Sequence, residues 1–480
     1  MSFTAKTCAT ALVGIGMFST AMTANATPVP GNHGNYVANY MINTWPVLDD
    51  YTTCAPSNCF SLNYATVPAS PAPKFWEYTN TVPLFAIWKL YEKTGRQKYY
   101  DYVKKFVDTY VDANGVINYG RTFPAGATPN DPTIQDTIQP ATLLFGLYKK
   151  TGDSRYLKAM QYVRTIFPTI KTNPQGAWWH KPTYANEQWL DAIYMSTPFL
   201  ARYAAQYETG ATQTATFNTL TNQIKLAAQY TFNPTKNLYY HGWNGATDGI
   251  WVGLDYKAGK YPPLDGQVTS PILWARSQAW YITGIVDVLE YLPKNHPDRN
   301  QLVQIVKNIA KGLKTYQGTN GLWYQVLDVK DGPLPANGGY PGESVPAQAN
   351  WQETSASALF VYSLAKAARL DIIDSSYLDV AKKGWAGVKT KVALSNSNNT
   401  VKVQGTVVGM SLGGVYNAYT NADFRTDLNN GPLPAPADQC VPSTYVKFTS
   451  PPVVCKYSYV RENVPQGLGA VMLAASEMEY

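Results

Sequence analysis

The chain has 480 residues, of which 45% are hydrophobic, 13% aromatic and only 15% charged. This apolar content allows a large core and excludes a disordered chain. The net charge of +7 is spread without a run of five basic residues, so we expect no nucleic-acid partner. Beyond the N-terminus no apolar run reaches the roughly 18 residues that span a bilayer, so we expect no membrane-spanning segment either. A small anionic substrate fits this modest positive excess at least as well.

The first 26 residues are predicted to be a secretory signal peptide. Lys6 precedes an apolar stretch of small residues, which ends at Ala24-Asn25-Ala26, a pattern typical of a cleavage site. An N-terminal helix is the alternative. With the signal removed, residues 27–480 are expected to form one domain, and the protein is expected to be exported to the periplasm or secreted.

Four cysteines remain in the mature chain, namely Cys54, Cys59, Cys440 and Cys455. An even number of cysteines in an exported chain predicts disulfide bonds. The local pairs Cys54–Cys59 and Cys440–Cys455 need the least chain closure, although other pairings or free thiols are also possible. No histidine or second cysteine pair stands at zinc-like spacing, so we expect no metal site.

A pattern of helical hairpins then recurs along the chain. The stretch YEKTG at 91–95 returns as YKKTG at 148–152, and a second amphipathic run follows each copy. Gly95 and Gly152 stand where a glycine ends a helix. Further helical stretches are predicted at 189–207, 212–230, 276–291, 301–316, 359–370 and 466–478. Strand-like alternation is sparse. We therefore predict an all-α domain of stacked hairpins that closes into an (α/α) barrel, with an open solenoid as the alternative.

Two aspartates are candidates for acid–base chemistry. Asp191 lies near the start of the helix predicted at 189–207, between Trp189 and Met195, and such apolar neighbours raise the pKa of a carboxyl group by desolvation. Asp136 is also predicted to open a helix. Each could simply stabilise the N-terminus of its helix. If both helices start at one end of the ring, the two carboxylates could instead form an acid–base pair.

Other polar residues stand among aromatic residues. His241 could be structural, or it could bind sugar hydroxyls. Arg276 begins a helix, where the helix dipole disfavours a cation, and this indicates a charged ligand or a partner acid. Trp274 and Trp280 provide either stacking faces for a sugar or core packing. The stretch ETSASA at 353–358 is interpreted as structural, with Ser and Thr capping the following helix.

Together these motifs resemble the unsaturated rhamnogalacturonyl hydrolases of glycoside hydrolase family 105, which are related to the unsaturated glucuronyl hydrolases of family 88. The resemblance runs from about residue 76 to the C-terminus. It rests on the stretches at 178–204, 274–280, 290–299, 321–328 and 353–358. It implies an (α/α)6 barrel and a reaction on lyase-generated pectin fragments, whose terminal uronic acid carries a C4=C5 double bond.

The resemblance also implies roles for individual residues. Asp191 matches the catalytic acid, which protonates C4 so that water adds at C5 and the glycosidic bond then breaks. Asp136 matches the second acid. The implied substrate-binding residues are His180, Lys181, Trp189, Met195, His241, Arg276 and Trp280. No cofactor is implied, and the expected partner is an unsaturated uronate-containing oligosaccharide. The alternatives are an unsaturated glucuronyl hydrolase acting on other polysaccharide fragments and a non-catalytic sugar-binding toroid.

Overall fold

The computed structural model describes residues 32–45, 76–119, 131–247, 268–270, 272–328, 333–334, 348–350, 352–395, 400–407, 460–461 and 463–480. The predicted signal sequence and the four cysteines of the mature chain lie outside these residues. No helix in the part of the chain that the structure describes combines the length and the apolar character of a membrane span.

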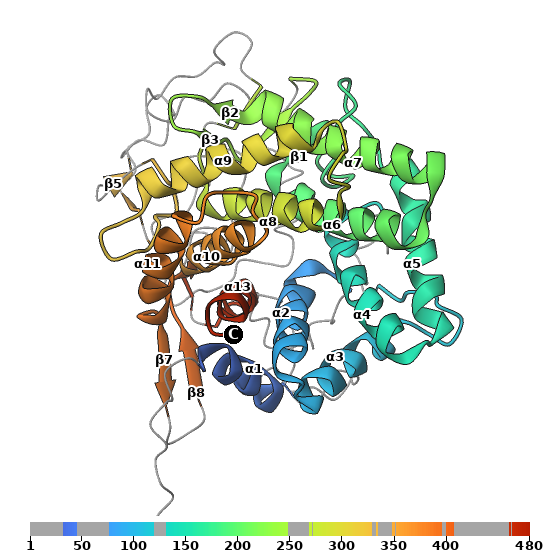
Figure 1. Ribbon diagram of the computed structural model, residues 1–480, viewed down its shortest axis with the longest axis horizontal. Helices are drawn as coiled ribbons and strands as arrows, with labels where there is room; N and C mark the ends of the chain where they lie inside the picture. The colour runs from blue at the N-terminus through green and yellow to red at the C-terminus, as the bar shows by residue number, and fades with distance from the viewer. Residues whose placement is uncertain are drawn as a thin grey trace, which may run out of the picture.

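The described residues form two concentric layers of helices (Figure 1). The inner helices are α2 (Tyr78–Thr94), α4 (Thr142–Thr151), α6 (Leu190–Tyr207), α8 (Ala275–Tyr291), α10 (Thr354–Arg369) and α13 (Pro465–Met478). The outer helices are α1 (His33–Thr44), α3 (Gln97–Tyr110), α5 (Ser154–Ile166), α7 (Gly210–Thr231), α9 (Arg299–Tyr316) and α11 (Tyr377–Lys389). Three short 3-10 turns, η1 (Gln135–Thr137), η2 (Gln139–Ala141) and η3 (Phe167–Thr169), complete the helical elements.

The inner helices close a ring. Helix α6 packs on α8, α8 on α10, α10 on α13 and α13 on α2, while η1, η2 and α4 connect α2 to α6. Each inner helix pairs with an outer one, and the last pair joins the two ends of the chain, because α13 packs against α1 (Figure 1). This arrangement confirms the predicted all-α, (α/α)6 barrel and excludes the open solenoid.

The inner helices are surrounded by other helices and bury most of their side chains, whereas the outer helices bury only the side that faces the inner layer. The first fifteen residues of the inner helix α8, from Ala275 to Leu289, are all buried. The outer helix α3 buries one stripe, with Tyr99, Val103 and Phe106 at helical spacing. Gly95 and Gly152 end α2 and α4 in the left-handed conformation, with φ of 67° and 69°, as predicted.

The named strands of the described residues form two-stranded antiparallel ribbons in the connections. The pairs are β1 (Glu187–Trp189) with β4 (Gly242–Asn244), β2 (Phe232–Asn233) with β3 (Leu238–Tyr239), β5 (Pro333–Leu334) with β6 (Gln348–Ala349), β7 (Val392–Ser395) with β8 (Thr400–Val403), and β9 (Thr406–Val407) with β10 (Val460–Arg461). In the first ribbon Trp189 pairs with Gly242. This register brings the residue before β4, His241, to the start of α6.

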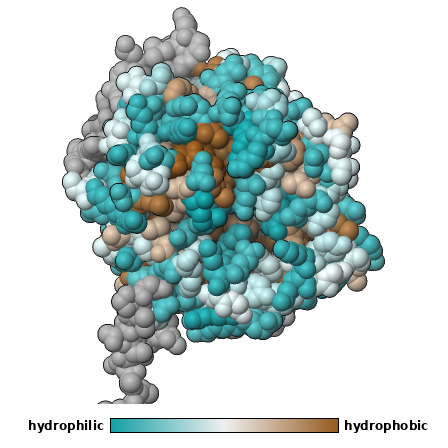
Figure 2. Space-filling model, in the orientation of Figure 1, coloured by the Kyte–Doolittle hydropathy of each residue, from teal (hydrophilic) through white to brown (hydrophobic). Residues whose placement is uncertain are grey.

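The six inner helices run in the same direction, so the ring has two distinct ends. Near their N-termini, Arg276 of α8 approaches Glu353 at the start of α10. Near their C-termini, Lys366 of α10 bonds to Asp287 of α8. The face of the ring turned to the viewer in Figure 2 is mainly hydrophilic, and apolar residues gather in a depression above its centre.

Three local predictions differ from the structure. Helix α1 was not predicted. Asp136 does not open an α-helix but lies in the 3-10 turn η1, because Pro140 lacks the N–H that would bond to the carbonyl of Asp136. Helix α10 is capped by Glu353 rather than by Ser or Thr, since the Glu353 carboxylate accepts the N–H of Ala356.

Candidate active site

The two candidate aspartates lie at the same end of the ring. Asp191 is the second residue of α6, and Asp136 lies in η1, which packs against α6. Both side chains are buried: Asp136 is 3% exposed and Asp191 is 8% exposed. The two carboxyl groups therefore meet the condition for an acid–base pair, because both lie at one end of the ring.

Asp136 is held by two basic side chains. Nε2 of His180 lies 2.9 Å from its Oδ1, and Nζ of Lys181 lies 2.7 Å from its Oδ2. Burial raises the pKa of Asp136, but the charges and hydrogen bonds of Lys181 and His180 outweigh burial and hold this pKa well below its usual range. Asp136 is therefore a carboxylate at neutral pH, and a poor proton donor.

Asp191 has a sparser environment. Its Oδ2 lies 3.3 Å from Nε2 of His241, and neither atom makes a hydrogen bond of good geometry. His241 is completely buried, and its carbonyl accepts the N–H of Leu190, the first residue of α6. The ribbon of β1 and β4 thus fixes the imidazole beside the carboxyl group, whose Oδ2 makes no hydrogen bond.

Aromatic rings connect these groups. Trp189 contacts the imidazoles of His180 and His241 edge-to-face, with centroids 5.0 and 4.9 Å away. Tyr184 stacks parallel to Trp189, with centroids 5.0 Å apart and planes 3° apart. Trp274 lies 4.7 Å from His241 on the side of α8. A continuous layer of indole and imidazole rings therefore runs between the two acids.

Arg276 ends this layer. Its guanidinium lies 4.6 Å from the ring of Trp274, and its Nη1 donates to the carbonyl of Val407 and lies 3.8 Å from Oε1 of Glu353. Glu353 is completely buried and also accepts the N–H of Val407. A partner acid, one of the two explanations predicted for a cation at the start of a helix, is therefore present.

Met195 and Trp280 occupy different surroundings from the other predicted residues. Met195 is 1% exposed and belongs to the hydrophobic core. Trp280 is also 1% exposed, stacks on Tyr194 and meets Tyr78 edge-to-face. Both residues make the contacts of core residues. For Trp280, core packing was one of the two roles that the sequence left open.

The sequence did not single out three residues that the structure places at the site. Tyr184 and Glu187 belong to the same stretch as His180, but neither has the residue type or spacing of a known catalytic pattern. Glu353 was interpreted only as part of a structural motif. Nothing in the local sequence indicated that it lies beside Arg276, because that contact joins two helices.

Several buried polar atoms without hydrogen-bond partners lie around the two acids. Among the described residues they include Oδ2 of Asp191, Nδ1 of His180, both ring nitrogens of His241, and Nε1 of Trp179 and of Trp274. Buried polar groups in proteins are nearly always paired, since an unpaired group costs free energy. The unpaired atoms beside Asp191 are therefore available to a polar ligand.

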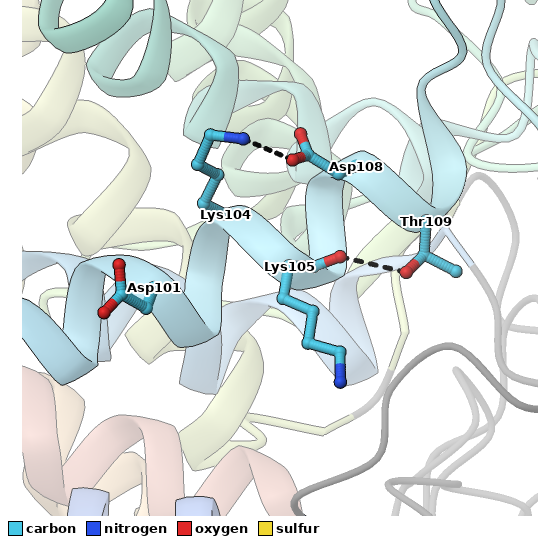
Figure 3. A pocket seen from close by; sticks show the side chains of 5 residues that line it. All are labelled: Asp101, Lys104, Lys105, Asp108 and Thr109. Carbon is cyan, nitrogen blue, oxygen red and sulfur yellow. Dashed lines mark hydrogen bonds and ion pairs between the residues drawn. The ribbon is translucent and has the colours of Figure 1, made fainter.

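The described residues also bear on two other kinds of site, a metal site and a surface pocket. No group of three or more His, Cys, Asp or Glu side chains that could hold a metal ion occurs within it. A pocket of about 580 Å³ lies on the outer helix α3 (Figure 3). There Lys104 pairs with Asp108, and the hydroxyl of Thr109 donates to the carbonyl of Lys105. The five residues that line this pocket all belong to one outer helix, and neither candidate acid is among them.

Comparison with known proteins gives concordant results. The sequence profile of Glycosyl Hydrolase Family 88 matches residues 60–431. Protein Atu3128 of Agrobacterium fabrum is 33% identical over 136 residues, which cover 28% of this chain and 47% of that protein. The unsaturated rhamnogalacturonyl hydrolase YesR of Bacillus subtilis is 23% identical over 265 residues, which cover 54% of this chain and 66% of YesR. The chain thus spans about half the length of the first relative and less than two thirds of the second.

A solved structure supports the same fold. A glycoside hydrolase of family 105 from C. acetobutylicum ATCC 824 superposes on the chain with a TM-score of 0.66. The two sequences are 23% identical, and the superposition covers 93% of this chain and 99% of the other. At this level of identity the likeness establishes the fold of the barrel.

Proposed function

Because the chain belongs to glycosyl hydrolase family 88, and is therefore a glycoside hydrolase, we propose that it releases the 4,5-unsaturated uronic acid from the non-reducing end of lyase-generated rhamnogalacturonan fragments. The observation that carries this proposal is the contrast between Asp136 and Asp191. Asp136 is paired with two basic side chains, and Asp191, at the same end of the barrel, has an oxygen that makes no hydrogen bond.

The proposed reaction begins with a proton transfer to carbon. Asp191 in its acid form donates its proton to C4, and the electron pair of the C4=C5 bond forms the new C–H bond. The positive charge that develops at C5 is shared with the ring oxygen. A water molecule then adds through its oxygen to C5 and returns one proton to the Asp191 carboxylate, which regains its acid form.

Bond cleavage follows from this hydration. The product at C5 is a hemiketal, which opens the sugar ring, and the resulting hemiacetal at C1 releases the rest of the oligosaccharide as an alcohol. The sum is one water consumed and one glycosidic bond broken. This route differs from the two-carboxylate displacement at the anomeric carbon used by most glycosidases.

The second acid is suited to electrostatic support rather than to proton donation. Asp136 stays ionised because Lys181 and His180 hold its pKa down, so it can stabilise the positive charge that develops at C5. Among the basic side chains beside the two acids, Lys181 is the most exposed, at 29%, and we propose that it attracts the uronate carboxylate. His241, Trp189 and Arg276 surround the two acids and are proposed to bound the substrate site.

The proposal is tested by loss of the ultraviolet absorbance of the conjugated double bond. Purified protein is incubated with unsaturated galacturonyl-rhamnose fragments and, in parallel, with unsaturated glucuronyl disaccharides. The proposal expects faster loss with the rhamnogalacturonan fragments. A preference for the glucuronyl substrates would support the alternative specificity. Binding without loss of absorbance on either substrate would support a sugar-binding toroid and overturn the enzymatic proposal.

A further inference from the structure

The stacked pair of Tyr184 and Trp189 touches each basic partner found for the two acids. Nζ of Lys181 lies 5.6 Å from the centroid of the Tyr184 ring. His180 contacts both rings, at 6.2 Å from Tyr184 and 5.0 Å from Trp189. His241 lies 4.9 Å from Trp189. One pair of rings therefore adjoins the partners of both carboxylates.

The pair is fixed by hydrogen bonds within the segment 180–189. Nε1 of Trp189 donates to Oε2 of Glu187 at 2.8 Å. The N–H of Glu187 donates to the carbonyl of Tyr184, and the N–H of His180 donates to the carbonyl of Glu187. Trp189 also belongs to β1, which pairs with β4 next to His241. The rings are thus held by backbone bonds as well as by stacking.

Stacking restricts what these rings can do. The parallel contact covers one face of Trp189 with Tyr184, so that face cannot stack on a sugar. Both imidazoles instead meet Trp189 at steep angles, 69° for His180 and 73° for His241. Such edge-to-face contacts fix the rotation of an imidazole ring, and hence the direction of its nitrogens.

We infer that Tyr184 and Trp189 form a positioning pair, which sets the orientation of His180 and His241 and so the relative placement of the two carboxylates. The inference rests on the proposed function. Tyr184 acts through Trp189 and Lys181 and does not itself react. Because misplacement by about 1 Å can lower the rate of a reaction by about a hundredfold, the loss of the stack affects turnover more than substrate binding.

The test compares three variants of the full-length protein on unsaturated rhamnogalacturonan fragments. Tyr184→Ala removes the stack at a partly exposed loop position, and Tyr184→Phe keeps the ring without its hydroxyl. Tyr148→Ala is the matched control, because Tyr148 also contacts an aromatic ring, that of Tyr207, but lies near the C-terminal end of the inner helix α4. Thermal unfolding midpoints confirm that each variant is folded, and Tyr184→Leu replaces the alanine variant if that one unfolds.

The inference expects kcat to fall about tenfold or more in Tyr184→Ala, with KM changed less than about threefold. Tyr184→Phe should recover most of this loss, and Tyr148→Ala should behave as wild type. Wild-type kcat in Tyr184→Ala would overturn the inference. A rise in KM alone would also overturn it, and would make Tyr184 a sugar-binding platform. A wild-type protein inactive on every unsaturated substrate would refute the proposed function instead.

Discussion

The two ends of the barrel treat their charged groups differently. At the N-terminal end of the inner helices, Asp191 has an oxygen without a hydrogen bond, although Asp136 nearby is fully paired. At the C-terminal end, Lys366 is 4% exposed and lies 2.6 Å from Asp287 and 2.7 Å from Glu290. Asp191 at one end keeps an oxygen without a hydrogen bond, and the buried cation Lys366 at the other end is paired twice.

This difference indicates that the N-terminal end of the ring serves function and the C-terminal end serves stability. A buried polar atom without a partner lowers stability, and proteins retain such atoms mainly where a ligand binds. A buried ion pair specifies how two helices meet, and removing one partner leaves an uncompensated charge. We therefore expect substitutions at the N-terminal end to affect turnover, and substitutions at the C-terminal end to affect unfolding.

The largest expected effect concerns Asp191. Asp191→Asn removes the proposed proton donor and should lower kcat by about 10²–10⁴-fold, the range for loss of a positioned general acid. The amide replaces a carboxyl group whose Oδ2 makes no hydrogen bond, so no hydrogen bond of Oδ2 is lost and the midpoint of thermal unfolding should stay the same or rise. The measurement is kcat by ultraviolet absorbance together with calorimetry. An active Asp191→Asn variant would show that another group donates the proton.

At the other end, Lys366→Met should destabilise the barrel without changing its chemistry. Burial lowers the pKa of Lys366, but Asp287, Tyr362 and Glu290 outweigh it and keep this pKa well above its usual value. Removing the cation strands the Asp287 carboxylate, at a cost of about 3–5 kcal/mol. Denaturant unfolding measures this cost.

An exposed ion pair at the same end provides the control for this substitution. Arg369, half exposed, pairs with Glu477, and Arg369→Gln should cost less than about 1 kcal/mol. Both variants should keep the kcat of the wild type at a temperature where they are folded. A large loss of kcat in folded Lys366→Met would contradict the separation of the two ends.

Lys181→Met should shift the pH dependence of kcat. Burial raises the pKa of Asp136, and Lys181 with His180 lowers it further than burial raises it. Without Lys181 the folded-state pKa of Asp136 rises, so the carboxylate is protonated at a higher pH and the acidic limb of the profile moves upward in pH. Lys181→Arg keeps the charge and should keep the limb in place. An unmoved limb in Lys181→Met would mean that ionised Asp136 is not required.

The same sign applies to stability. A carboxyl group with a depressed folded-state pKa stabilises the protein above its unfolded pKa of about 3.9 and loses this contribution as the pH falls toward the folded value. Lys181→Met should therefore reduce the stability gained between strongly acidic and neutral pH. Unfolding by denaturant at a series of pH values measures this difference against wild type.

The smallest expected effect concerns the closure of the ring by the two ends of the chain. The carboxylate of Glu479 accepts the N–H of His33 at 3.1 Å and the N–H of Gly34 at 3.2 Å, which caps α1. Glu479→Ala should cost about 1 kcal/mol of stability, the usual effect of losing a helix cap, and should leave kcat unchanged. A measurable loss of kcat would show that the last hairpin contributes to the site.

The barrel can be predicted from the sequence because the signals for its helices lie within short stretches of the chain. A glycine at the end of a helix, as at Gly95, and an apolar period of 3.6 residues act within one hairpin. The sequence predicts that Asp136 opens a helix, whereas the structure has the 3-10 turn η1 there, because Pro140 lacks the N–H that an α-helix would bond to the carbonyl of Asp136. The start of α6 at Asp191 was recognised from its own residues.

The rest of the site depends on contacts between distant segments. Glu353 meets Arg276 only because α8 and α10 are neighbours in the ring, and His241 meets Asp191 only through the register of β1 and β4. Residue type gave no sign of Tyr184, whose position depends on stacking. Such pairings follow from the closed ring and not from any single stretch.

The central claim is that Asp191 protonates a carbon atom of the substrate rather than a glycosidic oxygen. The most direct test is to run the reaction in D₂O and to locate the label in the released sugar by NMR. The proposed hydration predicts deuterium bound to C4 of the released uronate, together with loss of the double bond. Release of an intact unsaturated sugar without deuterium at C4 would show attack at the anomeric carbon and contradict the account.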